Sequence, residues 1–142
     1  MTRSAVMSRD NVLVVERFER AFVRGDMDEV LSLLHEDIVV HEAPSLPYAG
    51  DHRGHDGFLK LAATFNGVWE MTSPLDLTFL DAGETTVVVL VRYDVIARAT
   101  GKAMTLDHVE IYTVRDGKIT DLDVYYRDTA AMLEATAGGR AL

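Results

Sequence analysis

The chain has 142 residues, 48% of them hydrophobic, and a formal net charge of −9 at pH 7. A chain of this length can bury a substantial core in a single domain. The acidic balance disfavours phosphate backbones and anionic lipids as partners, because like charges repel before contact. We therefore predict one domain spanning residues 1–142, with frayed tails at 1–8 and 137–142, and neither a nucleic-acid-binding nor a membrane-binding protein.

The chain has no cysteine, which excludes disulfides, thiolate nucleophiles and cysteine-based zinc or iron–sulfur sites. No apolar run approaches the ~20 residues that are needed to span a bilayer. The N-terminus also lacks the apolar segment of a signal peptide. These features predict a soluble protein of the reducing cytoplasm.

The first part of the sequence predicts a helical hairpin. Apolar residues recur at the spacing of one helical face over residues 10–24, and Gly25 is a natural stop for that helix. Asp26 then lies where an N-cap is expected, with Glu29 three residues later as in a capping box. A second, short helix is therefore expected over residues 26–34.

A short strand, a loop and a third helix are expected next. Residues 38–42 form an apolar run that ends in a glutamate. Prolines and glycines punctuate residues 43–54, which predicts a long loop without regular structure. Helical spacing of apolar residues returns over 55–68, with Trp69 beyond it.

From Leu75 onward, β-branched runs separated by turns predict four long strands in a meander. The turns are expected at residues 81–84, 100–101 and 115–118. A short helix over residues 128–136 closes the chain. The predicted class is α+β, with helices laid on one face of a curved antiparallel sheet.

Strand parity predicts which side chains share a face of the sheet. Over residues 86–96 both faces are apolar, and helices can cover only one face of a sheet in so small a protein. An apolar stripe left exposed is an association surface, so we expect a homodimer through the outer face. We assign to that outer face the stripe of Val87, Val89, Val91, Tyr93 and Val95.

Two glutamates lie where the pattern expects apolar residues. Glu42 ends the first predicted strand, and Glu110 lies in mid-strand between His108 and Tyr112. A buried carboxylate is costly unless it is paired, hydrogen-bonded or protonated, so each is a candidate for proton transfer. The structural alternatives are a solvated or arginine-paired Glu42 and an ion pair between Glu110 and Arg92.

The order of elements, together with the segments RGDMDEVLSLLHEDIVVHE and VRDGKITDLDVYY, resembles the SnoaL-like superfamily, which includes ketosteroid isomerase-like and nuclear transport factor 2-like proteins. The resemblance implies an α+β cone, in which three helices lie on the concave face of a curved antiparallel sheet. Such folds host polyketide cyclases, ketosteroid isomerases, epoxide hydrolases and plain binding modules. It therefore implies a small-molecule pocket without fixing the reaction.

The segment HEDIVVHEAPS resembles the part of ketosteroid isomerases that bears the general base, which implies that role for Glu42. VEIYTVRDGKI resembles the part that bears the oxyanion-hole acid, which implies Glu110. One carboxyl must stay ionised to remove a proton next to a carbonyl, while the other stays protonated to donate to the oxyanion. The oxyanion-hole tyrosine of that family falls on Phe18, with Tyr112 or Tyr126 as substitutes.

Two other sub-families match in part. Arg92-x-Asp94 resembles the strand of limonene epoxide hydrolases in which an arginine orients two aspartates. The second aspartate falls on Val124, so Glu110 would have to serve; alternatively, the arginine and aspartate form a structural pair. In SnoaL-type cyclases, whose working pair is a histidine and an aspartate, the histidine position falls near Glu110, beside His108, and the aspartate close to Val124.

We predict a pocket for a small, largely apolar molecule that carries a carbonyl or similar oxygen. The leading hypothesis is cofactor-free general acid–base catalysis of the isomerase or polyketide-cyclase kind. The alternatives are a limonene-type epoxide hydrolase and a binding module without chemistry. The candidate catalytic residues are Glu42, Glu110, Arg92, Asp94 and His108.

The remaining candidates concern the pocket walls and metals. The spacing of His41, His52 and His55 matches no zinc motif, so no metal is expected, and no cofactor either. Aromatic side chains would make the pocket apolar and suited to rings. The expected substrate-binding residues are Phe18, Tyr48, Phe65, Trp69, Tyr112, Val124 and Tyr126.

Overall fold

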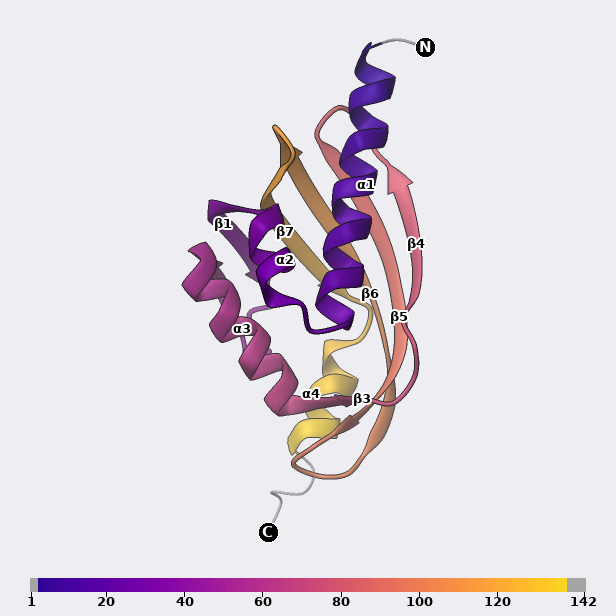
Figure 1. The fold of residues 1–142 in the computed structure, drawn as a ribbon. Helices are drawn as coiled ribbons and strands as arrows, with labels where there is room; N and C mark the ends of the chain where they lie inside the picture. The colour runs from indigo at the N-terminus through magenta and orange to yellow at the C-terminus, as the bar shows by residue number, and fades with distance from the viewer. Residues whose placement is uncertain (1–2, 138–142) are drawn as a thin grey trace.

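A curved sheet wraps around three helices in residues 3–137, the part of the chain that the computed structural model describes (Figure 1). Residues 1–2 and 138–142, where parts of the predicted tails fall, lie outside the described residues. The helices are α1 (Arg3–Val23), α2 (Met27–Leu33), α3 (Gly54–Val68) and α4 (Thr129–Ala137). The strands are β1 (Leu34–Glu42), β2 (Gly50–Arg53), β3 (Trp69–Met71), β4 (Asp76–Asp81), β5 (Thr86–Ala97), β6 (Ala103–Arg115) and β7 (Lys118–Tyr126).

The strands form one sheet in the order β2-β1-β7-β6-β5-β3, and β4 pairs with β5 along the same edge as β3. The predicted α+β class and curved sheet are confirmed. Every pairing is antiparallel except the one between β1 and β7, which is parallel. A parallel pair needs a long connection, and the elements between β1 and β7 provide it.

Short sequence signals explain where helix α2 begins and where the chain turns between β6 and β7. The Glu29 backbone N–H donates to the Asp26 carboxylate over 3.2 Å at the start of α2, as the capping box predicts. The hairpin between β6 and β7 turns at Asp116 and Gly117, which both have positive φ, the geometry of a type I′ turn. The turn predicted at residues 115–118 is therefore confirmed.

Three strands and one helix boundary differ from the prediction. Strand β1 begins at Leu34, before the predicted start at Ile38. The expectation of a loop over residues 43–54 is wrong for 50–53, which form β2 because their backbone pairs with β1 from Val39 to Glu42. β3 was not predicted; it pairs with the last residues of β5. The backbone of α1 is helical from Arg3, well before the predicted start. Strands β2 and β3 are too short to carry an apolar period, so backbone pairing alone defines them.

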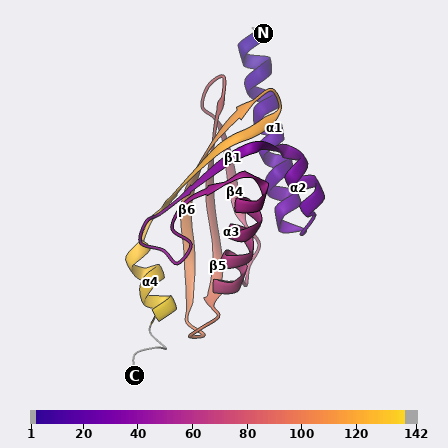
Figure 2. The ribbon, with the colours of Figure 1, turned by 90° about the vertical axis from the view of Figure 1, so that its left-hand side faces the viewer.

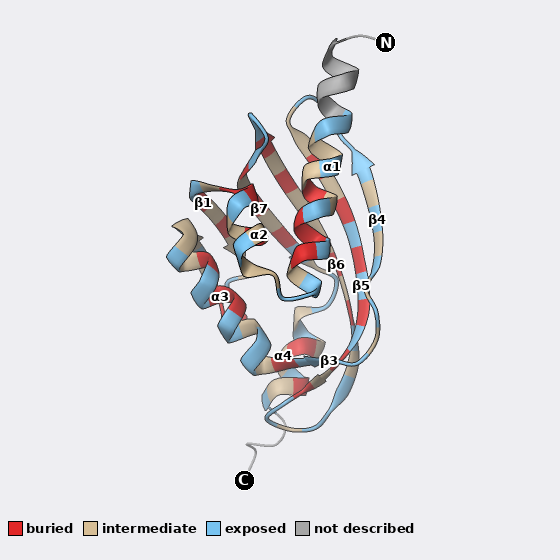
Figure 3. Cartoon of the chain, viewed as in Figure 1, coloured by how far each residue is buried: buried red, intermediate tan, exposed pale blue. Residues whose placement is uncertain are grey.

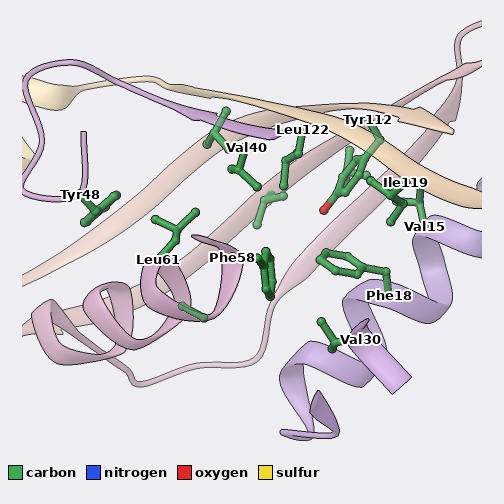
Figure 4. Packing of buried hydrophobic residues seen from close by; sticks show 14 of the residues in the cluster. Val15, Phe18, Val30, Val40, Tyr48, Phe58, Leu61, Tyr112, Ile119 and Leu122 are labelled. Carbon is green, nitrogen blue, oxygen red and sulfur yellow. The ribbon is translucent and has the colours of Figure 1, made fainter. Parts of the chain in front are cut away.

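Helices α1, α2 and α3 lie on the concave side of the sheet, and α4 lies at one end of it (Figures 1 and 2). Helix α1 contacts β4 to β7, and α3 contacts β1, β2 and β3. The buried residues are concentrated between these helices and the sheet (Figure 3). Figure 4 shows Val15 and Phe18 of α1 packing towards Tyr112, Ile119 and Leu122 of the sheet.

The predicted outer stripe of β5 is wrong, because Val87, Val89, Val91, Tyr93 and Val95 are buried under the helices. The outer face instead carries the alternate residues, among them the exposed Leu90, Arg92 and Asp94. Both faces of this strand are apolar, so parity separates the two sets without saying which faces inward. The stripe without charges is the one that entered the core.

Candidate functional site

A cavity of about 100 Å³ lies between the concave face of the sheet and helices α1 and α3. Most of its walls are apolar or aromatic, with contributions from Phe18, Phe58 and Phe65 of the helices. Among the described residues that line it, none is a lysine or an arginine. Its ionisable lining residues are Glu19, Glu42, Tyr93, His108, Glu110, Tyr112 and Tyr126.

Strand register brings most of these groups together. His108, Glu110 and Tyr112 alternate along β6, so all three side chains face the helices. Glu110 pairs directly with Val124 of β7. On the other side of β7, His41 of β1 pairs with Asp123, which places Glu42 beside Val124. Glu42 and Glu110 therefore flank one apolar residue, with about 10 Å between their backbones at the usual strand spacing.

Glu42 is largely buried in the cavity wall. Burial raises the pKa of its carboxyl to about 7, and a hydrogen bond with the Tyr126 hydroxyl opposes that rise in part. The buried Oε1 atom has no hydrogen-bond partner among the described residues. An ionisable oxygen with a pKa near neutrality that is free to bind a ligand proton is what a general base requires.

Tyr126 links Glu42 to two residues outside the cavity wall. The Tyr126 hydroxyl is hydrogen-bonded to that of Tyr48, which accepts a hydrogen bond of 3.2 Å from Trp69 Nε1. Burial raises the pKa of Tyr48 to about 12 and raises that of Tyr126 as well, so both remain neutral donors. This chain of donors holds the Tyr126 hydroxyl against Glu42.

Glu110 lies in a second group of polar side chains, together with Tyr112 and Glu19. The Tyr112 hydroxyl donates to Glu19 Oε1, and it lies 3.0 Å from Glu110 Oε1. Burial raises the pKa of Glu110 well above its ordinary value, and the charge of Glu19 and a hydrogen bond with it raise it further. Glu110 thus holds its proton to higher pH than an exposed glutamate does.

His108 pairs with Tyr126 across β6 and β7, and its ring lies 5.8 Å from the Tyr93 ring and 5.1 Å from the Tyr126 ring, measured between centroids. Burial lowers its pKa to about 4, so the imidazole is neutral at physiological pH. Neither ring nitrogen has a hydrogen-bond partner among the described residues. Nδ1 lies 3.9 Å from Glu110 Oε2. A neutral imidazole in this position offers a ligand one donor and one acceptor.

The structure brings most of the predicted site residues to this cavity. The residues that line it as expected are Glu42, Glu110, His108, Phe18, Phe65, Tyr112, Val124 and Tyr126. Tyr48 and Trp69 lie behind the wall, where they act through Tyr126 and Phe65.

The expectation that Arg92 and Asp94 share a site with Glu110 is wrong. Both side chains project from the outer face of β5, where Asp94 accepts a 2.8 Å hydrogen bond from the Thr105 hydroxyl. The alternative ion pair between Arg92 and Glu110 is excluded by the same placement, because the sheet lies between them. Successive residues of a strand face opposite sides, and the wrong side was assigned to the cavity.

Glu19 is the site residue that sequence reasoning missed. It is only 5% exposed, on the face of α1 that enters the cavity. The sequence holds a signal for it, because Val15, Phe18, Glu19 and Phe22 follow the i, i+3, i+4, i+7 spacing of one helical face. A carboxylate in that apolar stripe is a buried acid of the same kind as Glu42 and Glu110.

The three histidines considered as metal ligands each have a different partner. His41 Nδ1 bonds the Asp51 carboxylate at 2.7 Å, while His52 and His55 bond the backbone carbonyls of Tyr48 and Leu34. No group of three acidic or histidine side chains in the described part of the chain is arranged to hold a metal ion. None of the helices described here combines the length and apolar character that a membrane span requires.

Comparisons with known proteins agree with this architecture. An NTF2-like protein from Burkholderia xenovorans LB400 is 31% identical over 90% of this chain and 96% of its own, with a TM-score of 0.82. TerC, solved as a co-crystal with polyporic acid, is 27% identical over 89% of this chain and 98% of its own, with a TM-score of 0.76.

A candidate polyketide cyclase from Xanthomonas campestris pv. campestris shares the fold, at 21% identity over 92% of this chain and 98% of its own and a TM-score of 0.74. A search of curated proteins finds no match. The family model described as the SnoaL-like domain matches residues 15–122, which contain β1 to β6, helices α2 and α3, and the part of α1 that lines the cavity. The chain therefore belongs to the SnoaL-like domain family.

Proposed function

We propose that the protein is a cofactor-free enzyme that performs general acid–base catalysis on a small, largely apolar carbonyl compound. Isomerisation of a double bond and aldol cyclisation are the reactions that fit this chemistry best. The observation that carries the proposal is the pairing of a base and an acid across one cavity. Glu42 has a pKa of about 7 and an unpartnered oxygen, while Glu110 holds its proton.

The two carboxyls divide the reaction between them. Glu42 removes a proton from the carbon next to the carbonyl, and the electron pair of that C–H bond moves towards the carbonyl oxygen. The Glu110 acid or the His108 N–H donates a hydrogen bond to this oxygen as its negative charge develops. Returning the proton from Glu42 to another carbon completes an isomerisation, whereas attack of the enol carbon on a second carbonyl gives a cyclisation.

The relatives support a small-molecule role at the level of the fold. One relative was co-crystallised with polyporic acid, and another is named a candidate polyketide cyclase. The cavity of about 100 Å³ is small beside the ~300–1,000 Å³ of typical ligand sites, so a ring-sized substrate suits it best. A larger substrate requires the aromatic side chains of α3 to move.

The test is turnover by a Glu42→Gln variant, which keeps the shape of the side chain and removes the base. A panel of cyclic enones and β-diketones is offered, and exchange of the acidic C–H for deuterium is followed by NMR in heavy water. We expect the wild type to speed the exchange for at least one compound and the variant to lose ~100-fold or more. The matched control is Glu36→Gln, an exposed glutamate of the same strand. Unchanged exchange in Glu42→Gln would contradict the proposal.

The epoxide hydrolase alternative requires an arginine and an aspartate in the cavity. Arg92 and Asp94 lie on the outer face of the sheet and do not meet this requirement. The binding module without chemistry stays open, and His108 favours it as much as catalysis. A ligand that binds this cavity equally well in wild type and in Glu42→Gln, with no exchange in either, would identify the protein as a binding module.

We also propose a homodimer through the outer face of the sheet, now on different residues. An outer apolar patch is formed by Leu80, Val88, Leu90, Val109, Ile111 and Tyr125, which lie together by strand pairing. Leu90 is 42% and Tyr125 is 60% exposed. A contiguous apolar patch that is exposed at Leu80, Leu90 and Tyr125 favours association. The cytoplasmic location expected from the cysteine-free sequence stays a prediction.

A further inference from the structure

The polar cluster of Glu19, Tyr112 and Glu110 has a geometry that limits how many protons it can hold. The Tyr112 hydroxyl contacts one oxygen of each carboxyl, and the two carboxyls are hydrogen-bonded to each other. Tyr112 is completely buried, and Glu19 nearly so. Each group is therefore within hydrogen-bonding distance of both others, away from bulk water.

Counting hydrogens shows that both carboxyls cannot be ionised together. The Tyr112 hydroxyl supplies a single hydrogen, which can serve only one of the three contacts well. Two ionised carboxylates would then contact each other in a region of low dielectric, where like charges repel strongly. One additional proton removes the repulsion and supplies the missing hydrogen. The cluster therefore requires at least one neutral carboxyl.

No lysine or arginine among the described residues that line the cavity offers another way to balance these charges. The arginines of α1 nearest in sequence pair elsewhere: Arg17 with Glu29 and Arg20 with Glu16. The titratable groups that line the cavity with Glu110 come from α1, β1, β5, β6 and β7, and they include no described lysine or arginine. They are Glu19 of α1, Glu42 of β1, Tyr93 of β5, His108 and Tyr112 of β6, and Tyr126 of β7.

The two oxygens of Glu110 face different surroundings. Oε1 faces the Tyr112 hydroxyl at 3.0 Å, whereas Oε2 faces the unpartnered His108 ring at 3.9 Å. Glu110 is thus the member of the cluster whose carboxyl also reaches the part of the cavity where a ligand oxygen would be recognised. Glu19 lies on the opposite wall and has its contacts within the cluster.

We propose that Glu19 is a positioning residue whose anionic carboxylate, bridged by Tyr112, keeps Glu110 protonated, so that Glu110 always enters the reaction as the acid. This inference rests on the proposed function for its catalytic meaning, but the charge state of Glu110 can be measured without any substrate. The raised pKa of Glu110 agrees with it: burial is the largest cause, the charge of Glu19 is the next, and the Tyr112 hydroxyl acts in the opposite direction.

The experiment is a carbon-13 NMR titration of the whole protein labelled at the glutamate side-chain carboxyl carbon. Glu110→Gln identifies the Glu110 resonance by its disappearance. In Glu19→Gln, which keeps the shape and removes the charge, we expect the Glu110 midpoint to fall by about one pH unit or more, a tenfold loss of proton affinity. In Tyr112→Phe we expect it to rise. The matched control is Glu16→Gln, a half-exposed glutamate on α1 that pairs with Arg20 and should leave the midpoint unchanged.

Opposite shifts in the two variants cannot come from a general loosening of the fold, which would move both midpoints towards the ordinary glutamate value. The inference is overturned if Glu110 is already ionised at pH 6 in the wild type, or if Glu19→Gln titrates as the Glu16→Gln control does. Circular dichroism checks that each variant is folded. Should Glu19→Gln fail to fold, Glu19→Asp, which keeps the charge, must retain the raised midpoint.

Activity distinguishes this inference from the proposed function. If Glu42→Gln leaves turnover unchanged, the proposed function fails, while the NMR result on Glu19 stands. With a substrate in hand, Glu19→Gln should move the alkaline limb of the kcat/KM profile to lower pH and leave the acid limb, set by Glu42, in place. A shift of the acid limb alone would contradict the positioning role.

Discussion

Glu42 and Glu110 face one cavity from the two strands that flank β7, with only Val124 between them in the sheet. Although 67 positions separate them in the sequence, both carboxyls meet the same apolar space. Their surroundings set them apart: Glu42 has a pKa of about 7, whereas Glu110 is held neutral by burial and by Glu19. Two carboxyls whose pKa values differ in this way can supply a base and an acid at the same pH.

The raised pKa of Glu42 should make the folded state less stable as pH rises. Its value is about 7 in the folded state against 4.5 in the unfolded state, so its stabilisation is complete below pH 4.5 and is lost as pH rises through 7. At pH 8, Glu42→Gln should therefore be more stable than the wild type, by up to roughly 3 kcal/mol. Urea denaturation at pH 4.5 and pH 8 measures this; a variant that is less stable at pH 8 would contradict it.

The buried His108 should make the folded state less stable as pH falls, which is the opposite of the effect of Glu42. Its folded pKa of about 4 lies below the unfolded value of 6.5, so its contribution is complete above pH 6.5 and is lost as pH falls through 4. His108→Phe should remove this loss of stability at low pH. It should also remove the buried ring nitrogens that have no hydrogen-bond partner, which should raise the free energy of unfolding by about 1–3 kcal/mol. Thermal denaturation at pH 5 and pH 8 separates the two effects of the substitution. At pH 8 only the removal of the unpartnered nitrogens contributes, whereas at pH 5 the change in protonation contributes as well. The proposal of ligand recognition requires that this stabler variant bind ligands more weakly.

The charge of the cavity should decide which ligands enter. Glu19, Glu42 and Glu110 line it without any described lysine or arginine, so an anion meets repulsion and no partner. At pH 8, benzoate should bind at least ~10-fold more weakly than benzyl alcohol, which has a similar size and no charge. Perturbation of NMR shifts of the cavity tyrosines provides the measurement. Tighter binding of benzoate would show that the cavity holds less negative charge than its residues indicate.

Phe58 should limit the size of the cavity. Its ring is buried and packs edge-on against Phe18 at 5.8 Å and Phe22 at 6.1 Å, measured between centroids. Phe58→Ala should lower the free energy of unfolding by about 3–5 kcal/mol and should admit larger ring compounds. The matched control is Leu59→Ala, an exposed neighbour on α3 that should change neither. A loss of stability without any gain in the size of bound ligands would mean that the space collapses.

The outer apolar patch should hold two copies of the chain together. Leu90→Glu places a charge at its centre, beside Val109, and should convert a dimer to a monomer in sedimentation velocity at micromolar concentration. Leu13→Glu, on the exposed side of α1, is the control that should leave the sedimentation coefficient unchanged. A wild type that sediments as a monomer would end the homodimer proposal.

Sequence reasoning succeeded where a pattern had one physical cause. The helical stripes, the Asp26 cap and the turn at Asp116 and Gly117 are local, and the structure confirms them. It failed where two arrangements satisfied the same pattern. Both faces of β5 are apolar, so the choice of the inner face depended on contacts with α1 that no spacing reveals.

The candidate site shows the same division. Glu42 and Glu110 could be identified because Glu42 ends one apolar strand and Glu110 interrupts another, and the resemblance of their segments to a known family placed them in one pocket. Glu19 interrupts an apolar helical stripe in the same manner, yet surface glutamates are so common in helices that the interruption carried no weight. Its importance became visible only when Tyr112 was found against it.

The position of β7 between β1 and β6 makes the cavity a late product of chain synthesis and folding. Glu42 emerges early from the ribosome, but β1 has no neighbour on its inner edge until β7 follows the hairpin turn. Pairings between such distant segments form slowly, because a long loop must close first. A nascent chain that stops before Lys118 would therefore contain both acids and lack the strand that sets the spacing between them.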